Sequence, residues 1–206
     1  QTWALQGVAL PEAIISGLYN TAGVRSLTFR ENTTNAPVTF EGVTLAAHSV
    51  YACVDGGTDN AVALSLFRKK SLGAGWNGGT TVNVTDPYSG QVYPVKFDRP
   101  TVRNIWAKIT VVTNGASYPD TPALVRAAMV DYANGQIEGE AGFVVGGDVS
   151  PFELASAVNR QAAPLYVRTC SVSTEGVTYT TAEIPMLVNQ KGGLIAGNID
   201  VTVTAT

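Results

Sequence analysis

Four segments of the chain place apolar residues on one face with the spacing of an α-helix. They predict helices at Pro11–Tyr19, Asp59–Lys70, Pro122–Ala133 and Pro151–Arg160. In the second of these, the apolar face consists of Val62, Ala63, Leu66 and Phe67. Each predicted helix therefore has one side to bury against other elements.

Residues at the ends of these segments favour helix termini. We expect Thr58 or Asp59 to cap the second helix, and Thr121 to cap the third ahead of Pro122. Ser150 and Glu153 match a capping box, in which the serine caps the helix and the glutamate reaches back to the serine backbone.

Between the helices, shorter runs alternate apolar and polar residues or are rich in β-branched residues, as strands are. The strands are predicted at Gly23–Phe29, Ser49–Val54, Thr80–Thr85, Val92–Phe97, Val102–Thr113, Leu165–Ser173 and Ile199–Thr204. The third and fourth flank Asp86-Pro87-Tyr88-Ser89-Gly90, which is typical of a turn, so residues 80–98 are expected to form a hairpin. Without strict β-α-β alternation, the fold class is predicted as α+β.

A turn-rich patch at Thr113–Tyr118 suggests a boundary between domains. It divides the chain into residues 1–113, which include the hairpin, and residues 114–206. Each half contains a helix that leads directly into a strand. We therefore expect two small helix-plus-antiparallel-sheet domains in tandem.

Composition and charge exclude several classes of protein. The 206 residues include 13 Lys+Arg and 16 Asp+Glu, which gives a net charge of −3. Charged residues make up only 14% of the chain, against about 25% in soluble domains. A non-specific nucleic-acid binder would carry a basic surface, so nucleic acid is not an expected partner. The apolar runs are too short for the ~20 residues of a membrane span.

The sequence contains few candidate residues for catalysis or metal binding. Its single histidine, His48, is expected to be a structural or surface residue, since no nucleophile motif accompanies it. Cys53 and Cys170 lie in apolar runs and are expected to be buried thiols. Asp55 and Asp59 lack the full spacing of a calcium loop. We therefore expect no catalytic residues, no metal and no cofactor.

Two further motifs have ordinary interpretations. The glycine-rich residues 73–79 lack the Lys-Ser/Thr of a phosphate-binding loop and precede a predicted strand, so a flexible connection is expected. Asn32-Thr33-Thr34 and Asn83-Val84-Thr85 match the glycosylation sequon, which a threonine-rich chain contains by chance.

An ordered set of segments in the first half resembles the baseplate J-like proteins of contractile-tailed phages. The segments are Gly23-Val24, Arg30–Thr34, His48–Tyr51, Val54–Gly57, Phe67–Gly75, Val82–Asp86 and Val95–Thr101. Together they span about Pro11–Val112, and the second half is similar to the family in layout. Family members are usually longer, and Gln1 stands where an initiator Met would be. The chain is therefore expected to be a processed form or a fragment of a longer protein.

The resemblance implies a structural component of the virion, a wedge subunit of the tail baseplate produced in the host cytoplasm. Its partners would be other baseplate and tail proteins and copies of itself, in a multimeric assembly. The expected contacts lie in residues 72–79, 87–93 and 99–101, and the candidate contact residues are Trp76, Asn77, Tyr88, Tyr93 and Arg99. A tailocin or another contractile injection device fits the same resemblance.

Two alternatives remain at this stage. In a carbohydrate-binding or receptor-binding module, Trp76, Tyr88, Tyr93 and Tyr118 would form the binding platform. In a hydrolase, scattered carboxylates such as Asp98 and Glu138 would act, although any protein supplies such pairs by chance.

Overall fold

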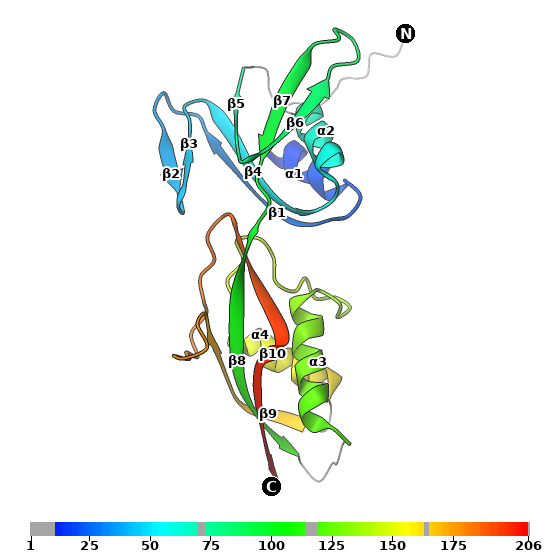
Figure 1. The fold of residues 1–206 in the computed structure, drawn as a ribbon, viewed down its shortest axis with the longest axis vertical. Coiled ribbons are helices and arrows are strands. Elements are labelled where there is room, and N and C mark those ends of the chain that lie inside the picture. The colour runs from blue at the N-terminus through cyan, green and yellow to red at the C-terminus, as the bar shows by residue number, and fades with distance from the viewer. Residues whose placement is uncertain (1–10, 70–72, 114–118, 163–164, 206) are drawn as a thin grey trace. The chain divides into compact units, whose positions relative to one another are not determined.

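The computed structural model describes residues 11–69, 73–113, 119–162 and 165–205. The described residues form four helices and ten strands in small sheets, which is the predicted mixed α+β class. The chain divides into two compact units (Figure 1). The first unit contains the chain up to Thr101 and also Leu187–Asn189. The second unit contains Val102–Met186 and the residues from Gln190 onward.

This division differs from the predicted boundary at Thr113–Tyr118, of which residues 114–118 lie outside the described residues. Strand β8 (Thr101–Thr113) is the central strand of the order β10-β8-β9, so from Val102 onward it belongs to the second unit. Leu187–Asn189 return to the first unit, where Thr28 Oγ1 donates to Val188 O at 2.6 Å and Thr101 N to Asn189 O at 2.9 Å. A turn-rich patch marks a loop, but it does not show which sheet the preceding strand joins.

The first unit is built on strand β4 (Ser49–Gly56), which is buried from Ser49 to Asp55. Strand β1 (Val24–Asn32) pairs with it antiparallel and β5 (Gly75–Asn77) pairs parallel on the other side. Helices α1 (Pro11–Tyr19) and α2 (Asp59–Lys69) pack against each other. Both helices were predicted, and Lys70, the predicted last residue of α2, lies outside the described residues.

Two hairpins complete the first unit. Strands β6 (Thr80–Thr85) and β7 (Val92–Phe97) pair antiparallel with the predicted bounds. Strands β2 (Val38–Phe40) and β3 (Val43–Leu45) form a second hairpin that was not predicted, because three residues are too few to show alternation. The helices, β4 and the larger hairpin share one apolar core, made by Ile14, Leu18, Ala52, Val54, Val62, Ala63, Leu66, Val84, Val95 and Phe97.

The second unit has β8 between β9 (Leu165–Ser173) and β10 (Gln190–Ala205). Alternate residues of β8 are buried as predicted, namely Ile105, Ala107, Ile109 and Val111. Helix α3 (Thr121–Ala133) lies along β10 (Figure 1), and α4 (Pro151–Gln161) contacts both β9 and α3. Strand β10 begins well before the predicted Ile199, because its glycines at 192, 193 and 197 hide the strand pattern.

One predicted helix cap is wrong, and another lacks its predicted hydrogen bonds. Asp120, not Thr121, caps α3, and its carboxylate accepts a hydrogen bond from Ala123 N at 2.9 Å. At α4, Ser150 is the N-cap residue as predicted, but the capping box does not form, since the Ser150 side chain makes no cap hydrogen bond. Glu153 instead accepts a hydrogen bond from the Tyr132 hydroxyl at 2.5 Å. The prediction for α2 is confirmed, because Thr58 Oγ1 accepts from Ala61 N at 3.3 Å.

Candidate functional site

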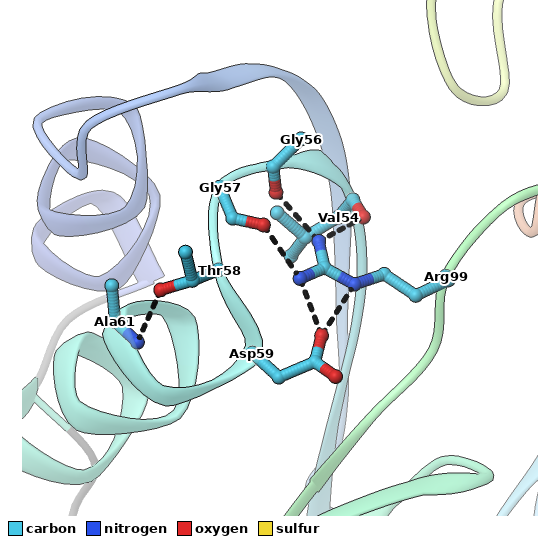
Figure 2. A network of polar contacts seen from close by, with 7 residues as sticks. All are labelled: Val54, Gly56, Gly57, Thr58, Asp59, Ala61 and Arg99. Atoms are coloured by element: carbon cyan, nitrogen blue, oxygen red, sulfur yellow. Dashed lines mark hydrogen bonds and ion pairs between the residues drawn. The ribbon is translucent and has the colours of Figure 1, made fainter.

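Arg99, a candidate contact residue, uses its guanidinium inside the first unit (Figure 2). Its Nη1 donates to Val54 O at 2.9 Å and to Gly56 O at 2.6 Å, while Nη2 donates to Gly57 O at 2.9 Å. Nε and Nη2 both donate to Asp59 Oδ1, at 3.0 and 2.6 Å. These five bonds match the five N–H donors of a guanidinium, so none is left to bind a partner.

This network fixes the loop that connects β4 to α2. Gly56 has a φ of +83°, and a Cβ atom there would lie 2.1 Å from Gly23 O, so only glycine fits. The carbonyls of Gly56 and Gly57 are thereby presented to one guanidinium, and Asp59 supplies the opposite charge at the start of α2. Figure 2 shows Arg99 reaching this loop from the segment that follows β7.

Asp98, next to Arg99, connects strand β4 to the β6–β7 hairpin. Its backbone bonds to β4 through Asp98 N to Ala52 O at 2.8 Å and Val54 N to Asp98 O at 3.0 Å. Its carboxylate accepts from the Tyr51 hydroxyl at 2.8 Å and from Gly79 N at 2.6 Å. Burial, followed by the Asp98 hydrogen bond, raises the pKa of Tyr51, and burial raises that of Cys53 to about 12. Both groups therefore stay neutral and structural.

Trp76 and Asn77 lie in β5, so residues 75–77 are a strand rather than the expected flexible connection. Asn77 Nδ2 donates to Ser49 Oγ at 2.7 Å and to Val50 O at 3.0 Å, and its Oδ1 accepts from Ala46 N. Trp76 is half-buried and packs against the core. Two of the candidate contact residues thus hold β5 in place.

Tyr88 and Tyr93 lie in the β6–β7 hairpin and differ in exposure. Tyr88 is 98% exposed in the turn. Tyr93 is half-buried, and its ring lies 5.1 Å from that of Phe67 on α2. Asp86 shapes the turn by accepting from Tyr88 N at 3.0 Å and from Ser89 Oγ at 2.8 Å, and these bonds lower its pKa. Of the five candidates, Tyr88 alone is fully available to a partner.

A groove of about 790 Å³ lies between α2 and this hairpin. We call it the α2–hairpin groove; its helix side is lined by Leu64, Phe67, Arg68 and Lys69, and its hairpin side includes Asp86 and Tyr88. The sequence does not reveal this groove, because the groove depends on how α2 packs against the hairpin that follows it.

The remaining candidates are structural in the described residues. His48 is exposed, with Nε2 2.7 Å from Asn35 Oδ1. Cys53 is buried and Cys170 half-buried, and both are free thiols. Of the proposed sugar-binding platform, Trp76 packs against the core and Tyr93 packs against Phe67. Tyr118 lies outside the described residues. No cluster of His, Cys, Asp or Glu suited to a metal occurs in the part of the chain that the structure describes.

Asn32, which belongs to a chance sequon and to the resembling segment Arg30–Thr34, is a structural residue of the first unit. Its side chain is 2% exposed. Nδ2 donates to Ala36 O and Ala46 O, both at 2.8 Å, and Oδ1 accepts from Thr34 N at 3.0 Å. The Asn-Thr-Thr sequence is a signal for such a turn, since asparagine side chains bond to backbone two residues on.

Comparison with known proteins gives no assignment. No protein-family model matches the chain, and no curated protein matches it. None of the helices among the described residues is long and apolar enough to cross a membrane.

Proposed function

We propose that this chain is a structural wedge subunit of a phage tail baseplate, which assembles with neighbouring tail proteins and with copies of itself around the tail hub. The ordered set of segments that resembles the baseplate J-like proteins supports the proposal. The observation that carries it is Tyr88, whose side chain is 98% exposed at the turn of a hairpin joined to α2 by the Phe67–Tyr93 ring contact.

Such a surface suits binding to another protein. Aromatic residues are enriched in interface cores, and a tyrosine side chain has few rotatable bonds to immobilise when it binds. Val92, at the other side of the turn, is 52% exposed, and Leu64 on α2 is 37% exposed. In the same unit, Arg99, Asn77 and Asp98 make their polar bonds within the fold, so they stabilise the elements that carry this surface.

Co-expression of the chain with the neighbouring tail proteins tests the proposal. Size-exclusion chromatography and negative-stain microscopy are expected to show a shared assembly. Tyr88→Ala should weaken it by about 2 kcal/mol, as for an interface residue that carries much of the binding energy. Tyr166→Ala is the matched control, since Tyr166 is 43% exposed in the second unit. A chain that stays monomeric and binds none of these proteins would contradict the proposal.

Glycan-array binding tests the carbohydrate-binding alternative. Only Tyr88 of its proposed aromatic platform is fully exposed in the described residues, and sugar platforms need a flat aromatic face open to solvent. Glycan binding that is lost in Tyr88→Ala would favour the alternative over an assembly role.

A further inference from the structure

We infer that the α2–hairpin groove binds an acidic segment of a neighbouring protein subunit, and that this segment inserts an apolar side chain between Leu64 and Tyr88. The inference rests on the proposed function for the nature of the partner, a tail protein. What it adds is the location of the contact and the chemistry of the segment that fits it.

Two cations line the groove at the end of α2. Arg68 and Lys69 are both exposed, and neither forms an ion pair with another residue that the structure describes. A Cβ added at Gly17 of α1 would lie 3.4 Å from Lys69 Cγ, so the stem of this lysine rests on α1. A side chain already held in this way loses less entropy on binding than a free one.

The carboxylate on the hairpin side of the groove does not pair with these cations. Asp86 bonds instead to Tyr88 N and Ser89 Oγ of its own turn. The groove lining therefore carries two positive charges and the negative charge of Asp86, and the two cations remain available to the carboxylates of a ligand. On a chain with a net charge of −3, this local positive charge selects an acidic segment, while other parts of the surface repel it.

Apolar side chains line the groove together with its charged ones. Phe67 is supported by Tyr93, with ring centroids 5.1 Å apart, and Leu64 and Tyr88 are 37% and 98% exposed. An apolar side chain would be buried among these groups, which is the usual anchor of a protein interface. A nucleic acid is less well matched, because its phosphates call for a run of cations along the groove rather than a pair at one end.

Fluorescence anisotropy with a labelled peptide built of Asp, Glu and Leu tests the inference. The comparison probes are a peptide of equal length built of Lys and Leu, one built of Asp, Glu and Ser, and a single-stranded oligonucleotide. We expect only the first to bind well, with affinity that falls as salt is added. Reversing both charges, R68E with K69E, should raise its Kd about tenfold or more. Leu64→Ser should also weaken binding.

The control variant is K96E with R168E, which changes the net charge equally at two exposed residues outside the groove. It should leave the Kd within about twofold. If the reversed variant does not fold, as judged by circular dichroism, R68Q with K69Q removes the same charges. The inference is overturned if the acidic peptide does not bind, if the basic peptide or the oligonucleotide binds as well, or if removing the charges leaves the Kd unchanged.

Co-purification separates this inference from the proposed function. If the chain binds tail proteins and the R68E/K69E variant binds them equally well, the groove assignment fails and the assembly role stands. If the acidic peptide binds at the groove but no tail protein binds the chain, the assembly role fails and the groove assignment stands.

Discussion

Arg99 shows how a residue that stands out in the sequence can serve the fold alone. The resemblance to the baseplate J-like proteins implies that residues 99–101 contact a partner. In the structure the five donors of Arg99 bond to the β4–α2 loop. Asp98, which shares its segment of the family resemblance with Arg99, and Asn32 of another such segment likewise bond within the first unit. These segments therefore specify how the unit folds.

Replacing Arg99 with lysine should lower the free energy of unfolding of the first unit by about 2–3 kcal/mol. A lysine ammonium lacks the planar fork that reaches three carbonyls and a carboxylate together, so several part-buried carbonyls lose their donor. Urea denaturation measures the change. Arg103→Lys is the control, because the Arg103 guanidinium donates to Pro185 O at an exposed position. Equal effects of the two substitutions would show that the Arg99 network adds no stability.

Replacing Asn32 with alanine should cost about 2 kcal/mol, since the Leu45 carbonyl loses a buried donor and the Ala36 and Ala46 carbonyls lose part-buried ones. Asn83→Ala provides a matched control, because Asn83 is the other sequon asparagine and lies exposed on β6. Thermal unfolding compares the two variants. A sequon interpretation predicts instead that both asparagines are equally dispensable for folding.

The two thiols should be inert in the folded protein. The pKa values of Cys53 and Cys170 are raised from 9.0 to about 12, chiefly by burial. A raised pKa favours the neutral thiol in the folded state, so its contribution to stability is complete below pH 9 and is lost as the pH rises towards 12. Reaction with a thiol reagent at neutral pH should require unfolding. Rapid labelling of Cys53 in the native protein would contradict this prediction.

At the level of elements, the sequence predicts what has a clear period and enough length. All four helices, the β6–β7 hairpin and the buried face of β8 have such patterns. Strands β2 and β3 have three residues each, and β5 is stabilised by pairing with β4 rather than by a pattern of its own. The groove between α2 and the hairpin is set by tertiary packing, which local periodicity does not encode.

The turn between β5 and β6 contains two adjacent glycines, Gly78 and Gly79, and only the first position requires glycine. Gly78 has a φ of +139°, and a Cβ there would lie 2.3 Å from the Phe97 carbonyl carbon. Gly78→Ala should therefore cost about 2 kcal/mol or more, because backbone must shift. At Gly79 a Cβ would lie 3.5 Å from Asp98 Oδ1, an ordinary contact, so Gly79→Ala should change stability much less. Chemical denaturation of the pair checks the difference, and equal losses would refute it.

At the level of the whole molecule, each unit has a core of its own. The core residues of the first unit come from the helices, β4 and the β6–β7 hairpin, and those of the second from β8, its partner strands, α3 and α4. The chain passes between the units after Thr101, after Met186 and after Asn189. This return of Leu187–Asn189 is why no single cut in the sequence separates the two units.

Because the two cores are separate, a destabilising substitution in one unit is expected to leave the other unit folded. Val54 and Val111 are both fully buried, one in each core, so Val54→Ala and Val111→Ala form a matched pair. Each should cost about 2 kcal/mol, because each removes similar apolar volume and leaves a cavity. Hydrogen exchange read by mass spectrometry should show Val54→Ala weakening protection in β1 and β4 while β8 and β9 keep theirs, and Val111→Ala should do the reverse. If either substitution lowers protection equally in both units, the two cores unfold as one, and the first unit could not serve as an independent carrier of the α2–hairpin groove.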